Sequence, residues 1–211
     1  MTQKRLSRSF YARAAHEVAP DLLGQVLVRI FPDGSRASVR IVEVEAYGPD
    51  DPASHAFRGE TPRNAVMFGP PGHLYVYFTY GIHHCMNVVT GETAEGSAVL
   101  LRAAEPLEGE EEMVVRRGRA RPLDLCSGPG RLAQALAVDR RDDGIDLVAG
   151  DGLWLEAASR VERVAVGNRV GVHETSRQWR YWLDGSPFVS RGRPGPPTAK
   201  RRTPRARSMT P

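Results

Sequence analysis

The stretch QVLVRIFPDGSRASVRIVEVEAY, residues 25–47, decides the fold predicted for this chain. Its two apolar runs, 25–31 and 37–47, flank the turn PDGSR, and this arrangement is typical of an antiparallel β-hairpin. Residues 73–90 predict a second hairpin, or a strand with a sharp corner at Gly81. Residues 97–106 predict a further strand, whose apolar centre is interrupted by Arg102.

The remaining segments predict short helices, turns and additional strands. Residues 9–19 favour a helix with Ser9 as its N-cap, and residues 20–24 break it. Residues 48–72 are rich in Pro and Gly and predict a long loop. A helix is predicted before Gly118, with its acids first and its arginines last. A turn and helix are predicted at 126–138, and strands at 153–156, 160–166 and 178–183. Hairpins dominate without βαβ alternation, so we expect one α+β domain over residues 1–190.

Charge separates the C-terminal tail, residues 191–211, from the rest of the chain. The chain has 29 Lys and Arg against 25 Asp and Glu, and the Pro-rich tail holds seven of the basic residues and no acid. Such a segment cannot build a core, so we expect it to be disordered. It either attracts nucleic acid in a salt-dependent way or only solubilises the chain.

Nothing in the sequence points to a membrane or to an oxidising compartment. No apolar run approaches the ~18 residues that a transmembrane helix needs, and the N-terminus lacks an apolar secretory core. The two cysteines, Cys85 and Cys126, are expected to be reduced thiols. We therefore expect a cytoplasmic protein, associated with the nucleoid if the source is prokaryotic.

Two glutamates, Glu43 and Glu45, lie within the apolar run 37–47. Strand side chains alternate, so both carboxylates share one face, which ends at Tyr47. Because burial of an unpaired carboxylate is costly, this face is either solvated or part of a functional cleft. Arg102 raises a related question: if it is buried, Glu43 or Glu45 can pair with it, and otherwise it lies at an exposed strand end.

Tyrosines follow the same alternation in the second predicted hairpin. Tyr75, Tyr77 and Thr79 share one face, and Tyr80 stands at the corner. This pattern fits either ordinary β-packing or a platform on which nucleobases stack.

Two polar motifs offer contacts to phosphate. TPRN supplies Thr61 and Arg63 within the long loop. SGPG places Ser127 before a helix, where free backbone N–H groups can receive a phosphate, although a simple capped helix start is the more economical interpretation.

Three adjacent residues, His83, His84 and Cys85, raise the possibility of a metal site. Neighbouring strand residues point to opposite faces, and no HxxxH or CxxC spacing accompanies them. We predict no metal site.

Long blocks of the chain together resemble one protein family. They are IVEVEAYGPDDPASHA, TPRNAVMFGPPGHLYVYFTYGIHHCMNVV, AVLLRAAEPLEG, DLCSGPGRLAQAL and RVGV…GSPFVS. In these blocks the chain is similar to the alkyladenine (3-methyladenine) DNA glycosylases. The resemblance implies a single domain with a curved antiparallel β-sheet and no metal or redox cofactor. Two departures are a Tyr47–His55 loop one residue shorter than usual and Ile82 where methionine is common.

The resemblance also implies roles for the reacting groups. Glu45 matches the glutamate that activates a water molecule, and Arg102 matches the arginine that helps to orient that water and Glu45. No role is implied for Glu43, which either lines the cleft or pairs with a basic neighbour.

Further matches concern the damaged base. Tyr47, His55 and Tyr77 match the side chains that sandwich a flipped base. Asn87 matches the pocket asparagine that discriminates against guanine-type substituents. Tyr80 matches the residue that enters the minor groove and fills the vacated stack.

The function implied is hydrolysis of the N-glycosidic bond of alkylated or deaminated purines in double-stranded DNA, which leaves an abasic site. We expect a monomer, and a monofunctional enzyme that uses water, because no lysine lies near these residues in the sequence. The alternative is a non-catalytic nucleic-acid-binding module that uses the tyrosines as a stacking platform. A metal-dependent nuclease lacks a plausible ligand set.

Overall fold

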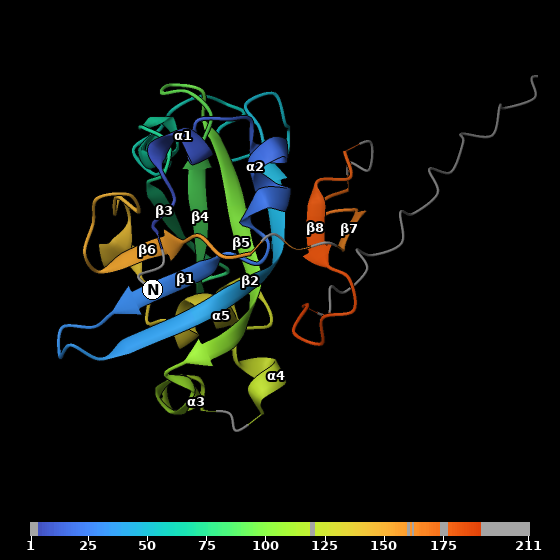
Figure 1. Ribbon diagram of the computed structural model, residues 1–211. Coiled ribbons are helices and arrows are strands. Elements are labelled where there is room, and N and C mark those ends of the chain that lie inside the picture. The colour runs from blue at the N-terminus through green and yellow to red at the C-terminus, as the bar shows by residue number, and fades with distance from the viewer. Residues whose placement is uncertain (1–3, 119–120, 160, 162, 174–176, 191–211) are drawn as a thin grey trace, which may run out of the picture.

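The computed structural model describes residues 4–118, 121–159, 161, 163–173 and 177–190. Its strands are β1 (Val26–Ile30), β2 (Arg36–Tyr47), β3 (Leu74–Thr79), β4 (His83–Thr90), β5 (Ser97–Glu108), β6 (Leu153–Glu156), β7 (Val164–Gly167) and β8 (Arg180–Leu183). They form an antiparallel sheet in the order β3-β4-β5-β2-β1-β6, with β8 paired to both β2 and β7. The sheet curls, so that β1 and β6 run obliquely to β3, β4 and β5 (Figure 1). The prediction of an α+β fold with a curved antiparallel sheet is confirmed.

Strand β2 is the hub of the sheet because three strands pair with it. Strand β5 follows one edge from residue 38 to residue 47, while β1 covers residues 36–40 and β8 covers residues 43–45 on the other edge. The second half of β2 is therefore flanked on both edges. Glu43 and Glu45 lie in this half and are both 0% exposed. The interpretation of their face as solvated is wrong.

Short helices cover the sheet and close the hydrophobic core. They are α1 (Arg8–Tyr11), α2 (Ala15–Leu22), α3 (Glu110–Arg117), α4 (Pro122–Leu125) and α5 (Pro129–Ala135), with the 3-10 turns η1 (Ala65–Phe68) and η2 (Arg140–Asp142). Helix α2 packs on β2 and β5, and α5 packs on β4 and β5. Val44 and Leu101 of the sheet meet Leu22 and Leu132 of these helices in one buried cluster.

The N-terminal helix prediction needs correction. Residues 9–19 are divided between α1 and α2, and α1 begins after Ser7 rather than Ser9. Pro20 does not end the helix but lies inside α2, which runs on to Leu22. Proline removes one backbone hydrogen bond. Burial of Val18 and Leu22, both 0% exposed, holds the last turn in place despite that loss.

Most of the other predicted elements are present. Both hairpins form, the second with its turn at Gly81, and the helix with acids first ends at Gly118, which has φ 55°. Among the described residues, β7 (Val164–Gly167) and β8 (Arg180–Leu183) correspond to the strands predicted at 160–166 and 178–183, and α4 was not predicted. Cys85 and Cys126 are buried free thiols. Within the described ranges, no helix combines the length and apolar character needed to cross a membrane. The tail 191–211 lies outside these ranges.

Candidate active site

An irregularity in the pairing of β2 with β5 brings Arg102 to two carboxylates. The register skips from Ala103 to Leu101, so Arg102 has no residue directly opposite in β2. Such bulges re-aim a side chain. Arg102 Nε lies 2.9 Å from Glu43 Oε1, and Arg102 Nη1 lies 3.2 Å from Glu45 Oε2. Arg102 is only 7% exposed, so it is buried and pairs with both glutamates, not with one.

Glu45 is held by three hydrogen-bond donors from three parts of the chain. Besides Arg102, the Tyr47 hydroxyl donates to Oε2 over 2.9 Å and the Val170 backbone N–H donates to Oε1 over 2.7 Å. Burial, and then the neighbouring Glu45 carboxylate, raise the pKa of the Tyr47 hydroxyl well above its usual value. Tyr47 is therefore protonated at neutral pH and serves as a donor. These contacts compensate a buried charge that would otherwise be costly.

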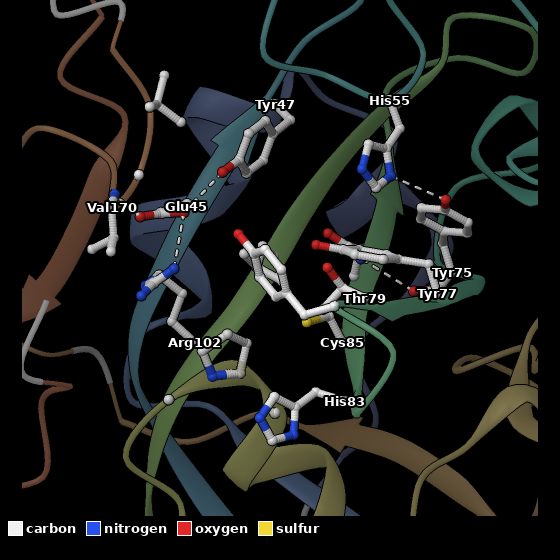
Figure 2. A pocket seen from close by; sticks show the side chains of 18 of the residues that line it. Glu45, Tyr47, His55, Tyr75, Tyr77, Thr79, His83, Cys85, Arg102 and Val170 are labelled. Atoms are coloured by element: carbon white, nitrogen blue, oxygen red, sulfur yellow. Dashed lines mark hydrogen bonds and ion pairs between the residues drawn. The ribbon is translucent and has the colours of Figure 1, made fainter. Parts of the chain in front are cut away.

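A cavity of about 500 Å³ opens beside this cluster. Its lining gathers most of the residues singled out by the sequence: Glu45, Tyr47, His55, Tyr77, Tyr80, Asn87, Arg102 and Ser127. Figure 2 shows Glu45 and Arg102 on one side of it and His55 with Tyr75 and Tyr77 across from them. The carboxylate thus faces an aromatic-lined recess and not bulk solvent.

The aromatic side of the cavity is a packed group of three rings. His55 and Tyr77 meet edge to face with centroids 4.5 Å apart, and Tyr75 stacks on Tyr77 at 5.5 Å. His55 Nδ1 is 3.1 Å from the Tyr75 hydroxyl, which orients the ring. Desolvation by the cavity walls, and then the charge of Arg63, lower the pKa of His55 below its ordinary value of 6.5. The imidazole is therefore neutral at pH 7.

Asn87 lies in the wall behind these rings. It is 5% exposed, and its Nδ2 donates to the backbone oxygen of Tyr75 over 3.2 Å. Because Asn87 is also part of the cavity lining, that bond fixes how the amide is presented to a ligand.

At the mouth of the cavity, Tyr80 projects from the β3–β4 turn. Its side chain is 90% exposed, and its backbone has φ 52°, which is uncommon for a residue other than glycine. Gly81 follows with φ 68°, and Ile82 is 70% exposed. An exposed apolar tip with two consecutive left-handed residues indicates a contact surface more than ordinary packing.

Of the three residues predicted to contact phosphate, one lines the cavity and two do not. Ser127 lines the cavity, and Arg131 Nη1 is 3.1 Å from its hydroxyl. Thr61 and Arg63 do not line it. The Thr61 hydroxyl donates to Asn64 Oδ1 over 2.8 Å, and the exposed Arg63 reaches the backbone oxygen of Phe78 over 3.3 Å.

Sequence reasoning missed two sets of residues that hold the site. Asp51 and Arg169 form an ion pair beneath Tyr47, with the Arg169 guanidinium 4.6 Å from the Tyr47 ring centroid. The Val170 amide that binds Glu45 follows directly along the chain. Arg180 and Ser190 bind Glu43. Arg180 lies on β8 and the other residues lie in loops. Asp51, Arg169, Val170 and Ser190 fall in the blocks that resemble the family, but no local pattern shows which residue each of them contacts. In the described part of the chain, no group of three His, Cys, Asp or Glu side chains is placed to hold a metal ion.

Comparisons with known proteins point to one family. The family model for methylpurine-DNA glycosylase (MPG) matches residues 9–187. A Streptomyces avermitilis protein is 52% identical over 204 residues, which cover 93% of this chain and 95% of the relative. A Chlorobaculum parvum protein is 47% identical over 202 residues, covering 94% and 96%, and a Methanocella arvoryzae protein is 46% identical over 196 residues, covering 90% and 98%. All three bear the name "Putative 3-methyladenine DNA glycosylase". The chain therefore belongs to the methylpurine-DNA glycosylase family.

Proposed function

We propose that this protein is a DNA base-excision repair glycosylase that removes alkylated or deaminated purines from double-stranded DNA. The observation that carries the proposal is a buried carboxylate, Glu45, beside an aromatic cavity wide enough for a purine. A pure binding module gains nothing from a carboxylate at the place where an anionic strand would enter. The membership of the chain in the methylpurine-DNA glycosylase family supports the same reaction.

The base would bind in the aromatic side of the cavity. Tyr47, His55 and Tyr77 would grip the flipped purine, and an electron-poor alkylated ring stacks best on electron-rich faces. His55 is neutral, and its Nδ1 is engaged with Tyr75, so its other ring nitrogen is the one available to the base. Asn87 would discriminate against guanine-type substituents through its fixed amide.

The target bond is hidden in a duplex, so the nucleotide has to leave the stack at a cost of a few kcal/mol. Tyr80 stands 90% exposed at the mouth of the cavity, where a wedge is needed. Entering the minor groove and filling the vacated stack, it would offset part of that cost. Thr61, Arg63 and Ser127 would contact the strand backbone around the opening.

Glu45 would take a proton from a water molecule as that water attacks C1′. Arg102 Nη1 contacts the carboxylate from β5, and the Val170 amide fixes its other oxygen, so the base is oriented before substrate arrives. The carboxylate also stabilises the oxocarbenium-like transition state. General base catalysis of this kind increases the reaction rate by roughly 10²–10⁴-fold. The leaving group also affects the rate. A cationic base departs readily, whereas a neutral base has to be protonated before it leaves.

A monofunctional reaction is favoured over an imine mechanism. Among the described residues, the cavity lining contains no lysine, and the sequence has only two, Lys4 and Lys200. Water is thus the nucleophile that the described site can supply. We further propose that the protein acts as a monomer on DNA in the cytoplasm or nucleoid, and that residues 1–190 form the catalytic unit while the basic tail adds affinity.

The test is base release from two labelled duplexes, one methylated and one carrying a single hypoxanthine, in the presence of EDTA. Strand breaks that appear only after alkali treatment support the glycosylase. Direct breaks that EDTA abolishes would indicate a nuclease, and binding without breaks would indicate the non-catalytic module. Either of these last two results overturns the proposal.

A further inference from the structure

Glu43 is a second buried carboxylate, one strand step from Glu45, for which the reaction has no use. Its side chain is 0% exposed and binds three donors. Oε1 accepts from Arg102 Nε over 2.9 Å and from Arg180 Nε over 2.8 Å, and Oε2 accepts from the Ser190 backbone N–H over 2.7 Å. A carboxyl group without solvent and with this many donors is built into the fold.

Glu43 and Glu45 bind different nitrogen atoms of the Arg102 guanidinium. The Nε edge faces Glu43, and Nη1 faces Glu45. A planar guanidinium held at two points cannot rotate, so the bond to Glu43 fixes the direction from which Arg102 approaches Glu45. It also divides the positive charge, because Arg102 neutralises two carboxylates rather than one.

We propose that Glu43 is a positioning residue for the glycosylase reaction, which acts on Glu45 through Arg102. It anchors the guanidinium and keeps part of the arginine's charge away from the general base. Glu45 therefore meets a guanidinium whose orientation is fixed and whose charge is shared with Glu43. This inference rests on the proposed function of the site.

Four charged or titratable groups interact with Glu45 directly: Tyr47 on β2, Arg102 on β5, Tyr77 on β3, and Arg169 in the loop before β8. Glu43 on β2 reaches Glu45 through Arg102. Arg180 on β8 pairs across from Glu45 in register, and its guanidinium binds Glu43. Among these groups, Glu43 is the one whose negative charge competes for Arg102. The direction in which removal of this charge shifts the pH–rate profile can therefore be stated in advance. Arg102 is left wholly to Glu45, ionised Glu45 is favoured, and the acid limb of the pH–rate profile moves to lower pH.

The experiment measures single-turnover base release against pH, with duplex affinity measured separately, for the full-length wild type and Glu43→Gln. The duplex carries one hypoxanthine, or is methylated DNA if the wild type releases only methylated bases. We expect the plateau rate of Glu43→Gln to fall about tenfold or more through misplacement and weakened basicity. Its acid limb moves to lower pH, and its duplex affinity is unchanged.

Two control variants separate positioning from simple support of the fold. Glu43→Asp keeps the charge but shortens the reach, so its acid limb returns to that of the wild type although its rate is reduced. Arg180→Gln breaks the link from β8 to Glu43 while leaving the Arg102 bond, so its acid limb does not move to lower pH. If Glu43→Gln alone does not fold, the double variant Glu43→Gln/Arg180→Gln keeps the cluster neutral, and its acid limb is expected to lie at lower pH than that of Arg180→Gln.

The outcomes are distinguishable. A wild type that releases no base overturns the proposed function and this inference with it. An active wild type with an unshifted acid limb in Glu43→Gln, or with the same shift in Arg180→Gln, overturns the role of Glu43 alone.

Discussion

Arg169 and Asp51 form an ion pair in which both side chains are 0% exposed. Arg169 Nη2 is 3.0 Å from Asp51 Oδ1, and Arg169 Nη1 also donates to the Ala46 backbone oxygen over 2.9 Å. The pair joins the loop after Tyr47 to the loop that carries Val170. It therefore clamps two of the groups that hold Glu45.

Asp51→Asn is expected to destabilise the protein by about 3–5 kcal/mol, because a buried arginine is left without its counter-charge. Chemical denaturation measures this. The matched control is Asp50→Asn in the adjacent position, where the Asp50 side chain is 74% exposed and pairs with Arg177, which is 25% exposed. That substitution is expected to change little. Equal effects at the two positions would contradict the clamp.

Glu45→Gln is expected to bind lesion-containing duplex normally and to release base at least about 100-fold more slowly, since it has lost the proton acceptor. Binding is followed by fluorescence anisotropy and release by alkali-dependent cleavage. Glu105→Gln provides a control outside the cavity, where Glu105 pairs with Arg40 over 2.8 Å. Wild-type turnover by Glu45→Gln would remove the central role of the carboxylate.

Tyr80→Ala is expected to slow base release from duplex by about tenfold, equivalent to ~1.4 kcal/mol of lost restacking. A single strand needs no restacking, so release from the same lesion in single-stranded DNA should change far less. The ratio of the two rates is the measurement. An equal loss on both substrates would show that Tyr80 acts in some way other than as a wedge.

The pH dependence of His55 has a definite sign. Desolvation and the charge of Arg63 lower the pKa of His55 below 6.5, so the unfolded chain binds this proton more readily than the native state. The stability that a neutral His55 contributes is present above about pH 6.5 and is lost as pH falls through the lower native pKa. NMR titration should therefore give a native pKa below 6.5, and a higher one in Arg63→Gln. A wild-type value at or above 6.5 would contradict this.

Removal of residues 191–211 is expected to weaken duplex binding and to reduce its salt dependence, because the tail carries seven Lys and Arg. The slope of log K against log salt should become shallower by about 0.9 for each phosphate that the tail neutralises. The single-turnover rate at saturating enzyme should stay the same, since every residue to which the reaction is assigned lies before residue 191. An unchanged slope would leave the tail as a solubilising terminus.

The sequence by itself determined the hairpins, because alternation and turn residues act locally. The runs 25–31 and 37–47 around PDGSR, and the pair of strands around Gly81, appear where their patterns predict them. It also determined which side chains are candidates for chemistry, since Glu45, Tyr47, His55, Tyr77, Asn87 and Arg102 stand in long blocks that resemble one family. Local patterns failed where packing outweighed propensity, as at Pro20 in α2.

Only the tertiary structure decided that Glu43 and Glu45 are buried. An alternating strand is consistent with a solvated face, and the answer depends on Val170, Arg180 and Ser190, which come from later parts of the chain and contact the two carboxylates. Arg102 reaches both glutamates because of a bulge between β2 and β5, and the alternation of residues in the sequence does not reveal that bulge. The Asp51–Arg169 clamp and the Val170 amide join residues more than a hundred positions apart, and such contacts arise from the closure of the fold, for which a local pattern carries no signal.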